Sequence, residues 1–121
     1  MSKRILIIED TEDNRRIMRI GLTGAGFEVL EATDGAAGIE VAVTQKPDLI
    51  LMDIQLPLID GYEATRRIRA TPGLEAVPII AVTSYALSGD ETKAREAGCN
   101  GYMAKPFSPR QLVAHVRSLL P

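Results

Sequence analysis

The sequence predicts an α/β protein with one parallel five-stranded sheet, doubly wound and flanked by five helices. Short apolar segments alternate with helical patterns five times along the 121 residues. That alternation is typical of a parallel sheet with right-handed crossovers and helices on both faces. Several short segments are apolar at every position, as expected for strands that are buried on both faces. The length and the 45% of hydrophobic residues fit a single domain with a real core.

Five segments have the length and composition of strands. They lie at residues 4–8, 27–32, 49–52, 78–82 and 101–104. The first, third and fourth are the most uniformly apolar, so we expect them at the centre of the sheet. The second alternates polar and apolar residues and the fifth is short, so both fit edge positions. This arrangement corresponds to the flavodoxin-like strand order 2-1-3-4-5.

The first helix is expected from Thr11 to Ala25, with Thr11 or Asp10 as its cap and Gly26 as its stop. Apolar and small residues recur along it at helical spacing and predict one buried stripe. The members of this stripe are Ile17, Met18, Gly21, Leu22 and Ala25.

Two Asp-Gly turns open the next two helices. Asp34-Gly35 leads into a helix over 36–44, and Asp60-Gly61 leads into a helix that ends near residue 70. Pro47 closes the second helix and introduces the third strand.

Capping boxes predict the starts of the last two helices. Ser88 stands three residues before Glu91, and Ser108 stands three before Gln111. The fourth helix stops at Gly98 and has a thin apolar face, chiefly two alanines, so we expect it to have low local stability. The fifth helix has the clearest apolar stripe, formed by Leu112, Val113, Val116, Leu119 and Leu120.

Polar side chains follow four of the five predicted strands. Glu9 and Asp10 follow the first, Asp53 the third, Thr83 the fourth and Lys105 the fifth. The carboxyl ends of parallel strands share one edge of a sheet, where open α/β sheets bind their ligands. Each like-charge pair of carboxylates ~4 Å apart costs about 4 kcal/mol at an effective dielectric near 20, and one lysine cannot neutralise three. A bound divalent cation relieves this repulsion, and an all-oxygen site favours Mg²⁺.

This set of groups has the components of a phosphoryl-transfer site. Carboxylates can accept a phosphoryl group covalently, and the remaining work is positioning and neutralising the oxygens of the transferred group. Asp53 can be the acceptor, while Mg²⁺ held by Glu9 and Asp10 bridges to the phosphoryl group. Thr83 can donate to a phosphoryl oxygen, and Lys105 supplies a point charge.

Four motifs in order resemble the receiver domain of the two-component response-regulator family, over essentially the whole chain. They are Ile-Ile-Glu-Asp at 7–10, Leu-Met-Asp-Ile-Gln-Leu-Pro at 51–57 with Asp60-Gly61, Val-Thr-Ser at 82–84 and Lys-Pro-Phe at 105–107. Each motif alone is weak, but all four at the expected strand ends are very specific. The resemblance is to the stand-alone, chemotaxis-regulator type.

The resemblance implies a role for each matching position of the acidic site. Asp53 corresponds to the phospho-acceptor, and Asp10 with Glu9 to the acids that hold Mg²⁺. The backbone carbonyl of Gln55 corresponds to a further metal ligand.

The resemblance also implies the residues that respond to phosphorylation. Thr83 corresponds to the switch hydroxyl and Lys105 to the phosphate-binding lysine, with a cis peptide bond between Lys105 and Pro106. Tyr102 corresponds to the aromatic residue that swings inward when Thr83 moves toward the phosphoryl group.

The expected function is that of a phosphorylatable signalling switch. The chain accepts a phosphoryl group from a histidine kinase or a histidine phosphotransfer protein and then changes its affinity for a downstream protein target. The output surface is expected on the fourth helix, fifth strand and fifth helix. The chain is not an enzyme, beyond assisting its own phosphorylation and dephosphorylation.

Composition narrows the partners and the compartment. The net charge of −2 favours neither nucleic acid nor a membrane surface, and no apolar stretch approaches the roughly 20 residues of a membrane span. The single cysteine, Cys99, cannot form an internal disulfide and fits the reducing cytoplasm. Three arginines of the first helix, Arg15, Arg16 and Arg19, are expected on a solvated face, with Glu12 pairing with Arg15 or Arg16.

Several alternatives stay open at this point. Residues 1–121 are expected to form a single receiver domain without an attached output domain, and the chain is then a stand-alone regulator or a fragment of a hybrid histidine kinase. A receiver that binds partners without phosphorylation is a further alternative. A haloacid-dehalogenase-like phosphatase needs a second Asp at the position of Gln55. A flavodoxin-like cofactor carrier needs a phosphate loop where residues 9–13 are mostly acidic.

Overall fold

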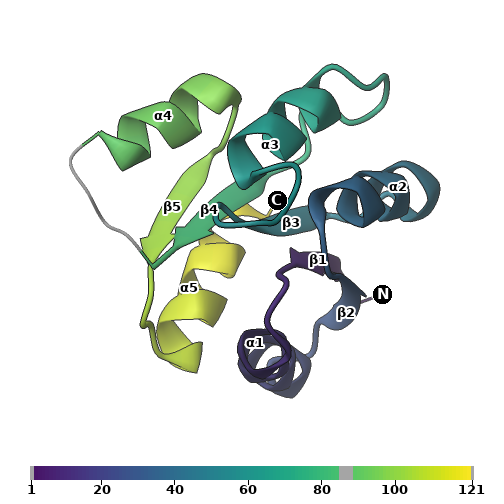
Figure 1. Ribbon diagram of the computed structural model, residues 1–121. Helices are drawn as coiled ribbons and strands as arrows, with labels where there is room; N and C mark the ends of the chain where they lie inside the picture. Colours follow the sequence, from purple (N-terminus) through teal and green to yellow (C-terminus); the bar gives the residue numbers. More distant parts are fainter. Residues whose placement is uncertain (1, 85–88, 121) are drawn as a thin grey trace.

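The computed structural model describes residues 2–84 and 89–120 and shows a central parallel sheet with helices on both faces (Figure 1). The strands are β1 (Arg4–Ile8), β2 (Glu28–Ala32), β3 (Leu49–Asp53), β4 (Ile79–Thr83) and β5 (Gly101–Ala104). All neighbouring pairs are parallel, and the order is β2-β1-β3-β4-β5. The predicted fold class and strand order are therefore confirmed, with β2 and β5 at the edges.

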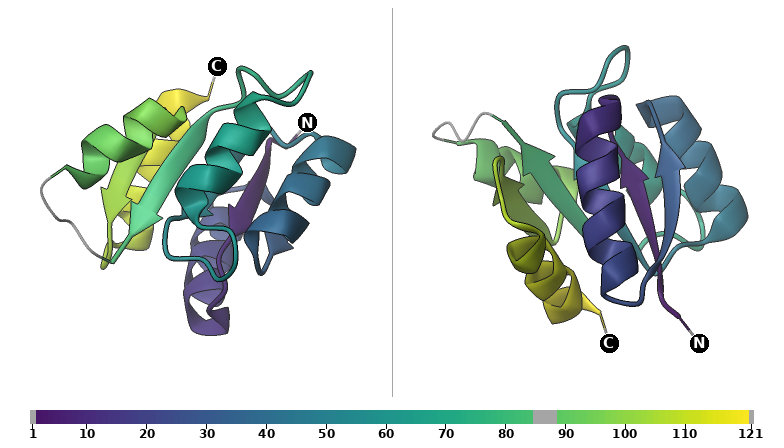
Figure 2. Two further views of the ribbon diagram at one scale, coloured as in Figure 1. Left: turned by 45° about the horizontal axis from the view of Figure 1, so that its top comes forward. Right: turned by 90° about the horizontal axis from the view of Figure 1, so that it is seen from below.

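Five helices form the two outer layers. They are α1 (Glu12–Gly24), α2 (Gly35–Gln45), α3 (Gly61–Arg69), α4 (Asp90–Ala97) and α5 (Pro109–Leu119). Helices α1 and α5 cover one face of the sheet, and α2, α3 and α4 cover the other (Figures 1 and 2). Among the residues that the structure describes, no helix has the length and apolar character needed to cross a membrane.

The three central strands supply most of the core. Successive side chains of a strand point to opposite faces, so Ile5 and Ile7 pack under α1 and α5 while Leu6 and Ile8 pack under α2. Every residue of β3 and β4 is buried, including the polar Asp53 and Thr83 at their ends. Fully burying one such aliphatic side chain stabilises the folded state by roughly 1.5–3 kcal/mol. The polar groups at the strand ends are therefore held by a well-packed core.

Helix α1 is close to the prediction, but its buried stripe is narrower. It has Thr11 at the N-cap, and Gly26 with φ +93° follows its end. Met18 and Leu22 are buried, whereas Ile17 is 50% exposed, so the assignment of Ile17 to the core is wrong. The reason is that Ile17 lies beside a surface groove rather than under α5. Gly21 does fit the stripe, because a Cβ there would lie 3.1 Å from Pro109 at the start of α5.

Aspartate caps fix the starts of α2 and α3. Asp34 accepts from the Ala37 N–H and Asp60 from the Glu63 N–H, each at 2.8 Å. Each such cap stabilises a helix by about 1 kcal/mol. Gly61 is required at the start of α3, because a Cβ there would collide with the backbone carbonyl of Asp53 and lie 2.7 Å from the Ile54 Cα. This close approach lets α3 begin directly beside the end of β3.

The two predicted capping boxes have different outcomes. Ser108 and Gln111 form both bonds of the box, at 3.1 and 2.8 Å. Helix α4 instead begins at Asp90 with Gly89 at its N-cap, so Glu91 does not occupy the third helical position that a box requires. Ser88, the other half of that predicted box, lies outside the described residues. The thin apolar face of α4 is confirmed, since Ala94 and Ala97 are its buried residues.

Candidate functional site

The carboxyl edge of the sheet brings the predicted acidic residues together. Glu9 and Asp10 follow β1, and Asp53 is the last residue of the neighbouring β3. One carboxylate oxygen from each of the three lies within 4.8 Å of the others. Glu9 and Asp53 are buried, whereas Asp10 is exposed. The group is therefore reachable from solvent at one side only.

A hollow of about 220 Å³ opens over these carboxylates. Every residue that lines it has a polar or charged side chain: Glu9, Asp10, Thr11, Asn14, Asp53, Gln55, Ser84 and Lys105. A cluster of oxygen donors with space for several waters has the chemistry that Mg²⁺ prefers. The residues present therefore fit a hard divalent cation.

Lys105 is the cation that balances the buried carboxylates. Its Nζ lies 2.6 Å from Glu9 Oε1 and 3.7 Å from Asp53 Oδ2. Glu9 Oε2 accepts from the Thr11 N–H at 3.1 Å, so both oxygens of Glu9 are already bonded. The peptide bond between Lys105 and Pro106 is cis, as the resemblance implied.

The two buried carboxyl groups have pKa values shifted in opposite directions. Burial, followed by the hydrogen bond and the charge of Glu9, raises the pKa of Asp53 to about 7. Burial also acts to raise the pKa of Glu9, but hydrogen bonds from Lys105, Asp53 and the Thr11 N–H outweigh it and lower that pKa. Without a metal, a proton is therefore held more tightly by Asp53 than by Glu9, and a divalent cation in the hollow would favour the ionised form of Asp53.

Thr83 stands at the end of β4, next to β3, and is 1% exposed. Its Oγ1 accepts a hydrogen bond of 2.6 Å from the Gln55 side chain. The sequence indicated Gln55 as a residue flanking the site and as a backbone metal ligand, but it did not predict this bond of its side chain to Thr83. The strand register predicts that residues after β3 and β4 are neighbours, but it does not predict which side chains bond.

A second hollow adjoins the acidic one, and a third adjoins the second, with which it shares Pro106 and Phe107. The second, a groove of about 360 Å³, shares Ser84 and Lys105 with the acidic hollow and has apolar walls formed by Ile17, Met18 and Phe107. Tyr102, the predicted switch aromatic, lies away from the acidic hollow. It lines a third hollow of about 420 Å³ with Phe107 and His115, between β5 and α5.

This combination of fold and site defines a receiver-type α/β domain, in which an acidic edge of a doubly wound sheet is paired with a lysine and a hydroxyl. A comparison with known families agrees: the family described as "Response regulator receiver domain" matches residues 5–117. The chain belongs to the response-regulator receiver family.

Individual relatives are similar over nearly the full chain. The polar-differentiation response regulator DivK of Brucella anthropi is 38% identical over 120 residues, which are 99% of this chain and 98% of that protein. The receiver domain of a sensor histidine kinase from Pseudomonas aeruginosa, solved with a magnesium ion in its active-site cleft, is 40% identical with a TM-score of 0.90. That match covers 98% of this chain and 97% of the other.

A solved structure with a more distant sequence has the same fold. The chemotaxis protein CheY4 of Vibrio cholerae is 25% identical with a TM-score of 0.95, over 99% of this chain and all of that one. The relatives thus include a response regulator and a domain of a sensor kinase. The expectation of a stand-alone chain stays a prediction.

Proposed function

We propose that this chain is a signalling switch that accepts a phosphoryl group on Asp53. An Oδ atom of Asp53 attacks the phosphorus of a phosphohistidine, the N–P bond breaks, and the neutral imidazole leaves after taking up a proton. The observation that carries this proposal is the meeting of three carboxylate oxygens within 4.8 Å, with the Lys105 ammonium beside them.

Glu9, Asp10, Asp53 and the backbone carbonyl of Gln55 would hold Mg²⁺ in the acidic hollow. When bound, the ion neutralises charge on the transferred oxygens. The backbone N–H of Gln55 orients the acceptor, because it donates to Asp53 Oδ1 at 3.0 Å. The solved magnesium complex of the similar kinase receiver supports this assignment.

Lys105 and Thr83 would contact the phosphoryl group once it is attached. Lys105 Nζ lies 3.7 Å from Asp53 Oδ2, so only a small movement away from Glu9 brings it to a phosphoryl oxygen. Thr83 is positioned by β4 beside the last residue pair of the β3–β4 ladder, Asp53 and Val82.

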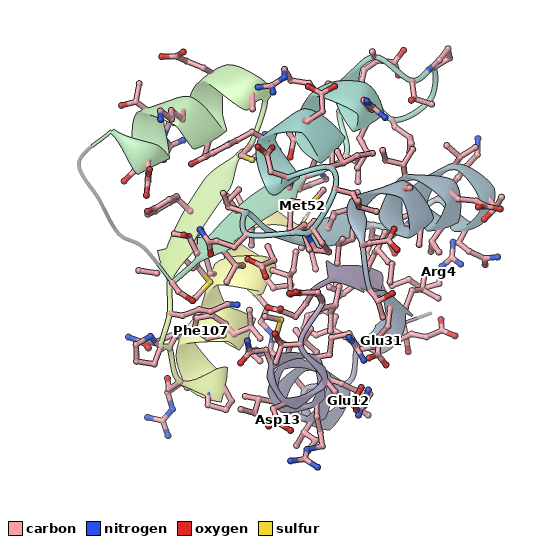
Figure 3. All side chains as sticks on the ribbon, viewed as in Figure 1. Arg4, Glu12, Asp13, Glu31, Met52 and Phe107 are labelled. Carbon is pink, nitrogen blue, oxygen red and sulfur yellow. The ribbon has the colours of Figure 1, made fainter. Side chains whose placement is uncertain are left out.

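The apolar groove beside the acidic hollow is the proposed seat of the phosphohistidine donor. Ile17 and Ile20 of α1 are 50% and 64% exposed. Ile17 lines the groove together with Phe107, which is labelled in Figure 3 near α5. A donor seated here would have its histidine next to Ser84 and Lys105, which both hollows share. Buried apolar contacts of this kind carry most of the energy of protein association.

We expect the charged residues of α1 to contribute less than the apolar groove to binding of the donor. Arg19 pairs with Glu31 at 2.7 Å, Arg15 with Glu12, and Arg16 is 3.7 Å from Asp13. The expectation that Glu12 pairs with Arg15 or Arg16 is confirmed for Arg15. The Arg15 side chain is only 11% exposed, however, so its assignment to a solvated face is wrong. These arginines are already paired with acids of the same chain, so an acidic partner would have to compete for them.

The output surface is proposed on α4, β5 and α5. Helix α4 contributes only Ala94 and Ala97 to the core of the described residues, so little packing opposes its displacement. Tyr102 lies on β5 next to the third hollow, where a change of its position would alter the surface offered to a target protein.

Incubation with a small acyl phosphate, followed by intact mass measurement, tests the function. We expect a gain of one phosphoryl group, ~80 Da, that needs Mg²⁺ and is absent in Asp53→Asn. Asp13→Asn is the matched control, because Asp13 is an exposed residue on α1. A gain that persists in Asp53→Asn would contradict the proposal.

A further inference from the structure

The side-chain amide of Gln55 joins the loop after β3 to the end of β4. Its Nε2 donates to Thr83 Oγ1 at 2.6 Å, and its Oε1 accepts from the Ser84 N–H at 3.2 Å. Because the Ser84 N–H can only donate, the amide oxygen must face Ser84 and the amide nitrogen must face Thr83. The two bonds together fix the orientation of the amide.

The backbone of the same residue touches the phosphoryl acceptor. The Gln55 N–H donates to Asp53 Oδ1 at 3.0 Å. Gln55 therefore connects Asp53 on one side with Thr83 and Ser84 on the other. Thr83 is 1% exposed, so its end of the bond lies in the protein interior. Hydrogen bonds are electrostatically stronger in the interior than in water.

We propose that the Gln55 side chain is a positioning residue that restrains Thr83 and Ser84 in the arrangement they have before phosphorylation. The inference rests on the proposed function. A phosphoryl group on Asp53 adds anionic acceptor oxygens, which attract the Thr83 hydroxyl. Movement of Oγ1 toward these oxygens stretches the bond to Gln55. The bond to the amide therefore opposes the phosphorylated state, and its loss favours that state.

Gln55→Met tests this restraint, because methionine has a similar length and removes both polar ends while the backbone N–H and carbonyl stay. The probe is beryllofluoride with Mg²⁺, which imitates a phosphoryl group on a carboxylate. We expect the variant to bind beryllofluoride about 3- to 10-fold more tightly, as the loss of one net hydrogen bond would give. Equal or weaker binding would overturn the inference.

A double-mutant cycle separates the restraint from a general effect on the loop. In a Thr83→Val background the bond to Gln55 is already absent, so Gln55→Met should leave the affinity for beryllofluoride unchanged. The same gain in both backgrounds would show that the amide does not act through Thr83. Gln45→Met is the matched control, because Gln45 is exposed at the end of α2, and we expect it to bind like the wild type.

A second readout needs neither the metal nor the phosphoryl mimic. In the metal-free protein, hydrogen exchange of the Ser84 amide should be about 3- to 10-fold faster in Gln55→Met, while Val82 in β4 keeps its protection. Unchanged exchange at Ser84 would contradict the restraint. A wild-type protein that does not bind beryllofluoride would contradict the proposed function itself, whereas binding that is insensitive to Gln55 would contradict this inference alone.

Discussion

Asp53 combines two properties that rarely occur in one carboxyl group. It is 3% exposed, and it still lines an open hollow beside the exposed Asp10. Burial raises the pKa of the Asp53 carboxyl in the absence of metal, and the same burial strengthens the attraction of its ionised form to a cation in the hollow. A proton and Mg²⁺ would therefore compete for one site.

This competition predicts how the stability of the metal-free protein depends on pH. The pKa of Asp53 is about 7 in the folded protein and near 3.8 when unfolded, so between these values the folded protein binds more protons. The contribution of Asp53 to the free energy of unfolding therefore falls as the pH rises from about 4 to about 7. Chemical denaturation with a chelator present measures it, as the difference between the wild type and Asp53→Asn.

The direction in which this difference in stability changes with pH shows whether Asp53 is protonated or ionised in the folded, metal-free protein. We expect the wild type to lose stability relative to Asp53→Asn as the pH rises through this window, and added Mg²⁺ to reverse the loss. A wild type that gains relative to the variant over the same window would mean that Asp53 is ionised in the folded, metal-free protein.

At the scale of elements, Arg69 at the end of α3 joins neighbouring elements at the amino ends of the strands, opposite the acidic site. It donates to the carbonyl of Gly98 at 2.9 Å and to Asn100 Oδ1 at 2.7 Å, and Asn100 Oδ1 also accepts from the Ile79 N–H. These bonds join α3, the turn after α4 and the start of β4. The arrangement holds α4 at its C-terminal end, where its own apolar face is thin.

Arg69→Met is therefore expected to lower the free energy of unfolding by about 1.5–3 kcal/mol, the range for hydrogen bonds to a charged group. Arg67→Met is the matched control on the same helix, because the exposed Arg67 pairs with Glu63 on the surface, and it should cost less than about 1 kcal/mol. Urea denaturation of both variants measures this. Equal losses would show that the Arg69 bonds do not join these elements.

The elements were largely predictable, because each depends on signals local to the sequence. Apolar runs predicted the strands. The spacing of Ser108 and Gln111 predicted the start of α5, and their bonds confirm it. Where the prediction failed, distant contacts decide the structure. Ile17 has helical spacing for the core, yet α5 packs over Gly21 and leaves it exposed. Strand ends placed Asp53 near Glu9, but the bond from Gln55 to Thr83 depends on side-chain rotamers that no spacing reveals.

At the scale of the whole molecule, β4 lies between the strands that carry the acidic residues and the surface that would report the state of the site. The acidic hollow lies at the carboxyl ends of the central strands β1 and β3. The proposed output surface comprises the edge strand β5 and the helices α4 and α5. Thr83 and Gln55 lie between them. A signal that starts at Asp53 thus has a short physical path through β4.

Amide exchange with and without beryllofluoride tests this path. We expect protection in α4, β5 and α5 to change, since α4 has few buried contacts, while the central β1 and β3 stay protected in both states. Equal protection of α4, β5 and α5 in the two states would refute the assignment of the output surface.

The proposal that Asp53 accepts the phosphoryl group is tested most directly by identifying the modified residue chemically. After incubation with a small acyl phosphate, borohydride reduction converts an aspartyl phosphate to homoserine, and peptide mass spectrometry shows which residue has changed. We expect homoserine at position 53, formed with Mg²⁺ and lost when a chelator replaces it. Homoserine at another aspartate, or an equal yield at position 53 without the metal, would contradict it.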